Sequence, residues 1–228
     1  MTAKLITLEG VDSAGKETQA KLLRDHLIKK GFKAEYISFP LYEKTIFGMA
    51  IDFFIRAKLA MGLGFATTDP LAASYLYAAD RRQGLPILLK LMEENDYVIC
   101  DRYTHSNLVH QGGKCATDEE KRKLMRQLEV IEYEFSELPK PYVTLFLYIP
   151  LEISMERAKK RAKSHGVTPD IVESNLNYVT KSYISGTFFA HELGWKVISG
   201  VKQNGDQPLI QLTEQEVHFA ILETLKLQ

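Results

Sequence analysis

Short apolar segments alternate with longer amphipathic segments along the whole chain. The apolar segments lie at 4–10, 33–39, 96–100, 142–149 and 195–199. They are rich in Ile, Val, Leu and Tyr, and several lack the polar alternation of a half-exposed strand. Strands buried on both faces of a parallel sheet have this composition, so the pattern predicts a five-stranded parallel sheet.

The amphipathic segments have apolar residues at helical spacing. They cover residues 16–30, 46–59, 71–94, 118–137, 151–163, 169–191 and 213–226. Alternating strands and helices favour a doubly wound α/β fold with helices on both faces of the sheet. No linker, repeat or low-complexity tract interrupts the pattern, so the sequence predicts one domain over residues 1–228.

Charge and composition exclude several classes of function. Lys plus Arg and Asp plus Glu both number 29, so the formal net charge is zero. This argues against a nucleic-acid or membrane surface held by charge alone. No apolar run reaches membrane length, and the N-terminal run is too short for a signal peptide. Cys100 and Cys115 lack metal-ligand spacing. We expect a cytoplasmic protein that binds neither nucleic acid nor membrane.

The segment EGVDSAGKETQ, residues 9–19, carries the clearest chemical motif. Gly10 is followed by four residues and then by Gly15 and Lys16, between a predicted strand and a predicted helix. This is the context of a phosphate-binding loop, whose backbone N–H groups and helix N-terminus face phosphate oxygens. The predicted ATP-binding residues are Gly10, Val11, Asp12, Ser13, Ala14, Gly15, Lys16, Glu17 and Thr18.

Glu17 stands where such loops have a Ser or Thr that binds magnesium. Three interpretations remain open. Glu17 binds magnesium directly or through water, it is a structural residue of the first helical turn, or the site has lost its chemistry. Thr18 is a poor direct replacement, because one helical step turns it about 100° away.

Five segments, in order, resemble motifs of the thymidylate kinase family of P-loop enzymes. The first is the loop, with Glu9, Gly10, Asp12, Gly15, Lys16 and Thr18. The others are SFPLY (38–42), YLYAADR (75–81), ICDRYTHSNLVHQGG (99–113) and LPKPYVTLFLYIPLEISMERAKKR (138–161). The resemblance covers about residues 4–200. It implies a P-loop NTPase-like fold with a basic lid at about 157–170, and Mg²⁺-dependent transfer of phosphate from ATP to dTMP. It also implies a homodimer.

The resemblance assigns catalytic roles to cationic residues around the two phosphates. Lys16 holds the ATP phosphates, and Arg102 bridges donor and acceptor with a planar fork suited to two oxygens. Asp12 positions the acceptor sugar and phosphate. Arg157 and Arg161 of the lid stabilise the transferred group. Without the resemblance, the lid residues are equally well read as a solvated basic helix.

The resemblance also assigns the acceptor site and the metal. Tyr77 stacks on the base, Arg81 donates to a thymine carbonyl, and Asn107 reads the pyrimidine edge. From residue types alone, Tyr77 in the core with Arg81 at its rim is favoured. The other predicted dTMP-binding residues are Asp12, Phe39, Tyr42, Arg102, His110, Asp170 and Glu173. The candidate magnesium ligands are Asp12, Glu17 and Asp101.

Two departures from the family pattern concern the acceptor. His110 stands where the family commonly has Phe or Tyr bordering the sugar, and Leu41 stands where an Arg often grips the acceptor phosphate. Two alternatives therefore stay open beside a dTMP kinase. One is a kinase for another nucleoside monophosphate. The other is a nucleotide-binding regulator made inactive by Glu17.

The segment IFGMAIDFFIRAKLAMGLGF, residues 46–65, is strongly apolar. Such a stretch fits a dimer interface, which the resemblance places near 46–59 and 71–94. It fits core packing equally well.

Overall fold

The structure of the 228-residue chain is a computed structural model. It describes residues 3–60, 68–164, 176–203 and 209–227, and their side chains except at 57–60, 158–159, 161–164 and 176.

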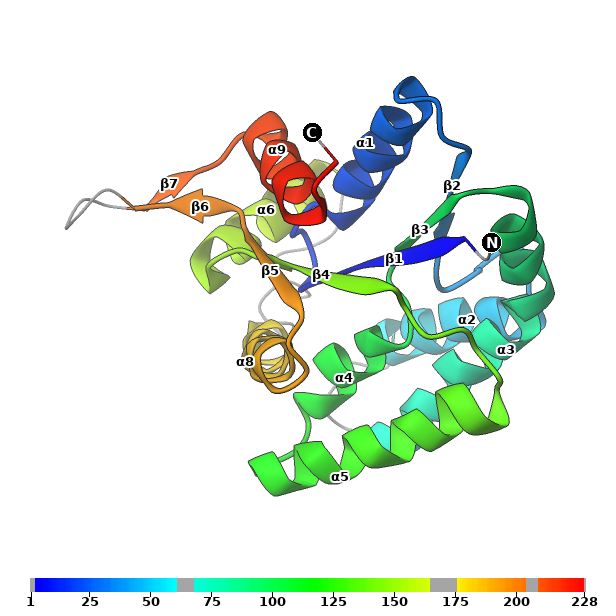
Figure 1. Cartoon of the computed structure of the whole chain (residues 1–228). Coiled ribbons are helices and arrows are strands. Elements are labelled where there is room, and N and C mark those ends of the chain that lie inside the picture. Colours follow the sequence, from blue (N-terminus) through cyan, green and yellow to red (C-terminus); the bar gives the residue numbers. More distant parts are fainter. Residues whose placement is uncertain (1–2, 61–67, 165–175, 204–208, 228) are drawn as a thin grey trace.

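A five-stranded parallel sheet forms the centre of the molecule (Figure 1). Its strands are β1 (Lys4–Glu9), β2 (Ala34–Ser38), β3 (Tyr97–Asp101), β4 (Val143–Tyr148) and β5 (Lys196–Ser199). They lie in the order β2-β3-β1-β4-β5, which confirms the predicted doubly wound fold. In such sheets, ligands bind outside the carboxyl ends of the strands, where the strand order reverses. Here that position is beside β1.

Helices cover both faces of the sheet. They are α1 (Lys16–Lys29), α2 (Ile46–Ala60), α3 (Pro70–Glu94), α4 (His105–Gly112), α5 (Asp118–Glu129), α6 (Leu151–Ser164), α8 (Leu176–Glu192) and α9 (Glu214–Leu225). Figure 1 shows α1 and α9 on one face and α3, α4, α5 and α8 on the other. The predicted arrangement of helices on both faces is therefore confirmed.

The alternation of side chains along β1 explains the two layers. Ile6 and Leu8 pack in one buried cluster with Leu23 of α1. Leu5 points the other way and packs in a second cluster with Leu88 of α3. Successive strand residues face opposite sides of a sheet, so an uninterrupted apolar run can bury both faces.

The predicted helix over 118–137 is not one regular helix. The α-helix α5 ends at Glu129 and continues as a π-helix, η2 (Val130–Phe135). The N–H of Ser136 donates to the carbonyl of Ile131, five residues back, at 3.0 Å. A π-turn is wider than an α-turn and changes which side chains face inward. Apolar periodicity alone does not reveal this change.

Three short elements were not predicted. Helix α4 has only two aliphatic residues, Leu108 and Val109, and therefore a weak periodic signal. Strands β6 (Val201–Lys202) and β7 (Ile210–Gln211) pair antiparallel, and each has only two residues, too few for a periodic signal.

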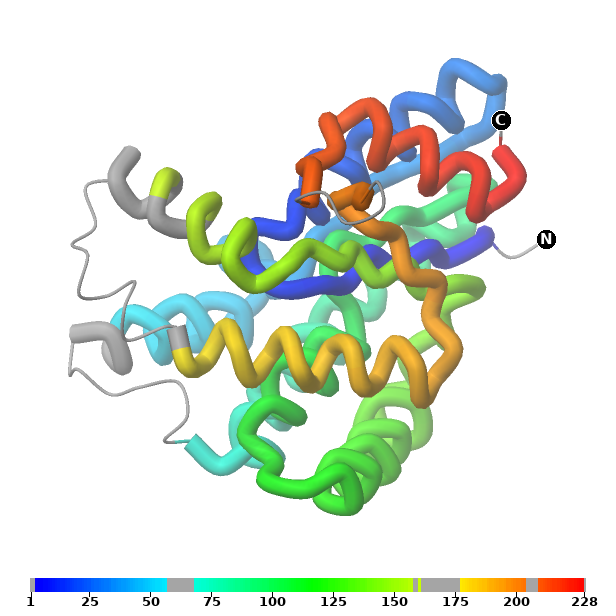
Figure 2. The backbone as a smooth tube through the Cα atoms, turned by 90° about the vertical axis from the view of Figure 1, so that its left-hand side faces the viewer, coloured from blue at the N-terminus to red at the C-terminus, as the bar shows by residue number. Residues whose placement is uncertain are grey.

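Helix α8 runs alongside α4 (Figure 2). The hydroxyl of Ser185 in α8 donates to the carbonyl of Leu108 in α4 at 2.8 Å. This packing brings the start of α8, far along the chain, to the carboxyl ends of the central strands. The helix had been predicted over 169–191, and its described part begins at Leu176.

Cys100 is a fully buried free thiol, and Cys115 is also free. Among the helices that the structure describes, none is both long and apolar enough to cross a membrane.

Candidate functional site

The loop between β1 and α1 depends on two glycines. Gly10 has a φ of 148°, and a Cβ there would lie 2.7 Å from the carbonyl oxygen of Leu147. Gly15 has a φ of 92° and precedes the first residue of α1. Residues other than glycine rarely adopt these conformations. The motif therefore forms a tight turn that leads into a helix N-terminus, as an anion-binding loop requires.

Lys16 is buried and folds back over this loop. Its Nζ donates to the carbonyl oxygens of Gly10 at 3.0 Å and Val11 at 2.8 Å. Burial, together with the positive charge of Arg102, lowers the pKa of Lys16 to about 8. A cation held at the mouth of a phosphate loop is placed to bind phosphate oxygens.

Glu17 lies on the exposed side of α1. Its Oε1 is 2.5 Å from Nζ of Lys21, one helical turn later. Both side chains are largely exposed, and such pairs contribute only a few tenths of a kcal/mol (about 0.3–0.5). This contact agrees with a structural role in the first turn, and the pair is weak enough to open.

The loop after β3 holds Arg102 in a left-handed conformation, with a φ of 63°. Backbone contacts fix this turn: the N–H of Arg102 donates to Leu8 O at 3.1 Å. The buried carboxylate of Glu9 accepts the N–H of Tyr103 at 2.8 Å and the hydroxyl of Ser106 at 2.5 Å. Burial raises the pKa of Glu9 to about 7. Glu9, at the end of β1, thus anchors the turn that presents Arg102.

The guanidinium of Arg102 contacts two side chains that had been predicted in the site. It forms an ion pair with Asp12 of the phosphate loop, and Nη1 lies 2.7 Å from Nε2 of His110. Burial raises the pKa of the Asp12 carboxyl, but the charge of Arg102 outweighs it and holds the pKa below its ordinary value.

The contact with Arg102 determines the tautomer of His110. Arginine has only donors, so Nε2 of His110 accepts and Nδ1 carries the hydrogen. Nδ1 lies 2.9 Å from the hydroxyl of Tyr178 in α8 and donates to it. Burial and the nearby Arg102 lower the pKa of His110 to about 3, so the ring is neutral at physiological pH.

A cavity of about 340 Å³ opens beside this pair. Eight predicted residues line it: Asp12, Phe39, Tyr42, Tyr77, Arg81, Arg102, Asn107 and His110. Five further residues line the cavity that had not been predicted to bind the acceptor: Pro40, Ile55, Ser106, Gln111 and Tyr178. The phosphate loop and the predicted base-reading residues therefore meet around one hollow.

Of the cavity residues that were not predicted, Gln111 could have been found from the sequence and Tyr178 could not. Gln111 lies four residues after Asn107 on α4, so a predicted helix there would have placed both on one face. Its Oε1 is buried, with no hydrogen-bond partner among the described residues. Tyr178 reaches the cavity only through the packing of α8 on α4, and no local pattern signals it.

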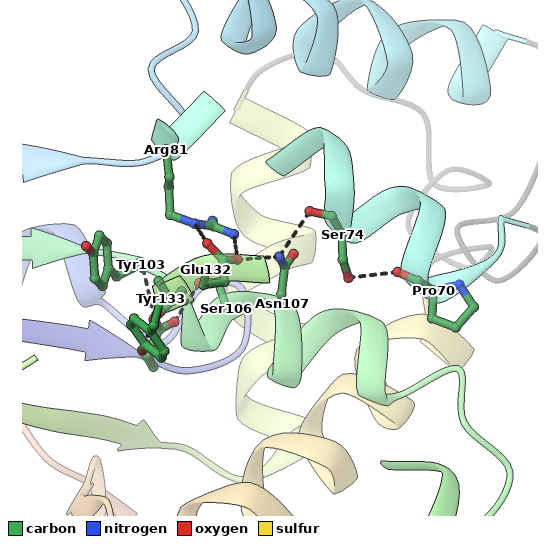
Figure 3. Close-up of polar contacts among 10 residues, drawn as sticks. Pro70, Ser74, Arg81, Tyr103, Ser106, Asn107, Glu132 and Tyr133 are labelled. Atoms are coloured by element: carbon green, nitrogen blue, oxygen red, sulfur yellow. Dashed lines mark hydrogen bonds and ion pairs between the residues drawn. The ribbon is translucent and has the colours of Figure 1, made fainter. Parts of the chain in front are cut away.

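The far end of the cavity is built on a buried ion pair (Figure 3). Arg81 binds Glu132 of η2 through two nitrogens, with Nε at 3.0 Å from Oε2. Asn107 donates through Nδ2 to Oε1 of Glu132 at 3.0 Å and to the carbonyl of Ser74 at 3.3 Å. Glu132, which the sequence analysis missed, thus fixes both predicted base-reading residues.

Asp101, at the end of β3, is the predicted magnesium ligand that best fits a metal. Its Oδ1 is buried with no partner among the described residues, and burial raises its pKa. The described residues contain no group of three or more His, Cys, Asp or Glu able to hold a metal. Magnesium often keeps several waters and takes only one or two carboxylates, so one buried carboxylate beside a phosphate loop fits it.

The lid residues are described only in part. Arg157 of α6 donates to the carbonyl of Ser13 at 3.5 Å and to Oε1 of Gln211 at 3.2 Å, so it lies against the phosphate loop. The side chain of Arg161, and residues Asp170 and Glu173, lie outside the described residues.

Known proteins resemble this chain in sequence and fold. A family model described as thymidylate kinase matches residues 8–198. The thymidylate kinase of Geotalea daltonii is 36% identical over 157 residues, covering 68% of this chain and 67% of that protein. The thymidylate kinase of Prochlorococcus marinus (strain MIT 9313) is 28% identical over 98% of each chain. The crystal structure of thymidylate kinase from Ehrlichia chaffeensis shares the fold, with a TM-score of 0.65 and 18% identity over 99% of this chain and 100% of that one.

Proposed function

Because this chain belongs to the thymidylate kinase family of phosphotransferases, we propose that it phosphorylates dTMP to dTDP with ATP. The observation that carries this proposal is the cavity of about 340 Å³. It joins the Arg102–Asp12 pair beside the phosphate loop to Tyr77, Arg81 and Asn107 at its other end. A nucleoside monophosphate has the same polarity, with a phosphate at one end and a base at the other.

At the phosphate end, this chain supplies position and positive charge. Phosphoryl transfer between two anions depends on these more than on covalent chemistry. Lys16 and the loop N–H groups bind the ATP phosphates. Arg102 bridges the donor and acceptor, and Asp12 and His110 hold its guanidinium in place. Arg157 approaches from α6 and adds a cation beside the loop.

At the base end, hydrogen-bond chemistry favours thymine. The side-chain amide nitrogen of Asn107 donates hydrogen bonds to Glu132 and to the carbonyl of Ser74, so the side-chain carbonyl oxygen of Asn107 remains as an acceptor. Gln111 adds a second buried acceptor. Thymine carries a donor at N3, whereas cytosine has an acceptor there, so dCMP is disfavoured. Uracil differs from thymine by one methyl group, which is worth about 10–200-fold in a well-packed pocket.

Magnesium fits the phosphate end. Asp101 would hold it, with Glu17 and Asp12 as further candidates, and the ion would neutralise charge on the ATP phosphates. Glu17 would first have to leave Lys21.

We further propose that the chain forms a cytoplasmic homodimer. Four apolar side chains on one helix, α2, are exposed: Ile46, Phe47, Met49 and Phe53. Phe53 is the most exposed of them, at 74%. An apolar face of this kind is typical of a permanent interface. Phe53→Glu should shift the mass measured by light scattering from dimer to monomer. A wild-type mass equal to one chain would overturn the dimer.

The deciding experiment measures ADP release from ATP and Mg²⁺ with dTMP, dUMP, dCMP, dGMP, dAMP and UMP offered separately. We expect turnover with dTMP above dUMP, and far above the other four. Faster turnover with another monophosphate would replace dTMP as the substrate. ATP binding without turnover on any acceptor would overturn the kinase and favour a nucleotide-binding regulator.

A further inference from the structure

A second cavity, of about 350 Å³, lies at the opposite end of the central strands. Its walls include the first residues of β4 and β5, whereas the candidate site lies beyond the carboxyl ends of the strands. Leu108, Met125 and Leu128 give it an apolar wall, and His105 and Trp195 give it an aromatic one. Its size is within the range of small-molecule sites, about 300–1,000 Å³.

The polar groups of this cavity restrict what it can bind. The indole Nε1 of Trp195 is a buried donor with no partner among the residues that the structure describes. The His105 ring, 4.8 Å from the indole, is neutral because burial lowers its pKa to about 4. Glu129, Glu132 and Lys196 also line the cavity, and Glu132 is already paired with Arg81. The walls therefore carry no net positive charge that would favour anions such as phosphates. A flat, uncharged ring with a hydrogen-bond acceptor matches these walls.

One carboxylate belongs to the walls of this cavity and also holds residues of the candidate site. Glu132 lines the second cavity, while its oxygens bind Arg81 and Asn107, which line the first. Figure 3 shows Glu132 between these two side chains. Glu132 lies on the π-helix η2, which orients its side chain toward Arg81 and Asn107. Such π-turns occur frequently at functional sites. Movement of this carboxylate would move both residues.

We propose that the second cavity binds a flat, uncharged heteroaromatic molecule, and that this molecule changes the affinity for dTMP by shifting the Glu132 carboxylate together with Arg81 and Asn107, without breaking their contacts. The first half of the proposal stands on the cavity alone. The second half rests on the proposed function, since it concerns the base end of the dTMP site.

Trp195 is the only tryptophan of the chain, so its fluorescence reports directly on the second cavity. We would titrate the full chain with benzimidazole, a flat ring that is uncharged at neutral pH and has a ring-nitrogen acceptor. A saturable change with a Kd of about 1 mM, typical of so small a ligand, is expected both without dTMP and with dTMP in excess. A change that does not saturate, or that dTMP abolishes, would overturn the second site.

Two valine variants form a matched pair of controls. Val143 lines the cavity, whereas Val197 is exposed on β5 and lies outside it. Val143→Phe should abolish the saturable change, and Val197→Phe should leave it intact. Retention in a folded Val143→Phe protein would overturn the proposal. If Val143→Phe does not fold, the test uses Trp195→Phe instead. Binding of benzimidazole to this variant and to wild type is then compared by ligand-detected NMR. We expect weaker binding to the variant, and equal binding would overturn the site.

The coupling is tested separately, by the KM for dTMP at saturating benzimidazole. We expect it to change by about fivefold while the KM for ATP stays constant, because the side-chain bonds of Glu132 among the described residues go to Arg81 and Asn107 at the base end. An unchanged KM for dTMP beside a saturable fluorescence change would overturn the coupling and keep the site. Absence of dTMP kinase activity would overturn the proposed function, and the fluorescence titration would still decide the first half.

Discussion

Two arginine–carboxylate pairs frame the candidate site, and they differ in exposure. The side chains of Arg102 and Asp12 are 24% and 38% exposed, whereas those of Arg81 and Glu132 are 3% and 1% exposed. The first pair borders the phosphate loop and the second the base end of the cavity. A partly hydrated pair can exchange partners at low cost, but a buried pair that loses one member leaves an uncompensated charge. We infer that Arg102 can turn to phosphates during the reaction, while Arg81 and Glu132 stay paired.

The largest expected effect is on catalysis at the exposed pair. Arg102→Ala should lower kcat by about a thousandfold, the scale of an arginine that stabilises a transferred phosphoryl group. The thermal midpoint should change little, since the pair is partly hydrated. Steady-state kinetics and calorimetry of the same preparation test this. A loss of folding with residual activity in the folded fraction would reverse the roles assigned to the two pairs.

The buried pair should show the opposite balance. Glu132→Gln leaves the Arg81 charge uncompensated and should cost about 3–5 kcal/mol of unfolding free energy, or roughly 10 °C in the thermal midpoint. Glu192→Gln, which breaks an exposed pair with Arg122, is the matched control and should leave the midpoint nearly unchanged. Equal midpoints for both variants would show that burial does not distinguish the pairs.

Glu9 anchors the turn that presents Arg102, and its titration should make the free energy of unfolding depend on pH. Its pKa is 4.5 unperturbed and about 7 in the folded chain. Between these values the unfolded chain releases the proton and the native chain keeps it, so stability falls as pH rises. From about pH 5 to pH 8, the titration of Glu9 should lower the free energy of unfolding by about 2 kcal/mol. Denaturant unfolding of wild type and Glu9→Gln checks it: their difference should grow across this interval, and a constant difference would contradict the assignment.

A smaller effect is expected at His110, which accepts a hydrogen bond from Arg102. His110→Phe removes the acceptor for Nη1 of Arg102 and should lower kcat/KM for dTMP about tenfold. His110→Gln keeps an acceptor and should recover most of the loss. Because the pKa of His110 is about 3, its charge should not change activity between about pH 5 and pH 8. A large loss in the Gln variant with none in the Phe variant would indicate that ring shape alone matters.

The smallest effect is expected at Glu17. Glu17→Ala should leave kcat within about twofold at saturating Mg²⁺. It should raise the half-saturating Mg²⁺ concentration a few-fold, because the exposed pair with Lys21 is weak enough for Glu17 to leave it and contribute to magnesium binding. Activity measured across a Mg²⁺ series, with Lys21→Ala as control, tests this. A tenfold fall in kcat at every Mg²⁺ concentration would place Glu17 directly in the reaction.

Local patterns predicted the phosphate end well. A loop of six residues between strand and helix fixes its own backbone, so Gly10, Gly15 and Lys16 could be placed from sequence alone. The five strands followed from their apolar runs, since burial on both faces imposes that composition.

Tertiary packing decided the base end. Glu132 comes from a π-turn that periodicity does not show, and it reaches Arg81 and Asn107 from η2 across the chain. Tyr178 arrives with α8, which packs on α4.

The sequence alone thus determined the sheet and the phosphate loop, because their causes are local: composition, glycine conformation and spacing. The contacts of Glu132 with Arg81 and Asn107, and of Tyr178 with His110, join residues 25 to 68 positions apart. Such contacts depend on how helices pack on a sheet face, and no short window of sequence contains that information.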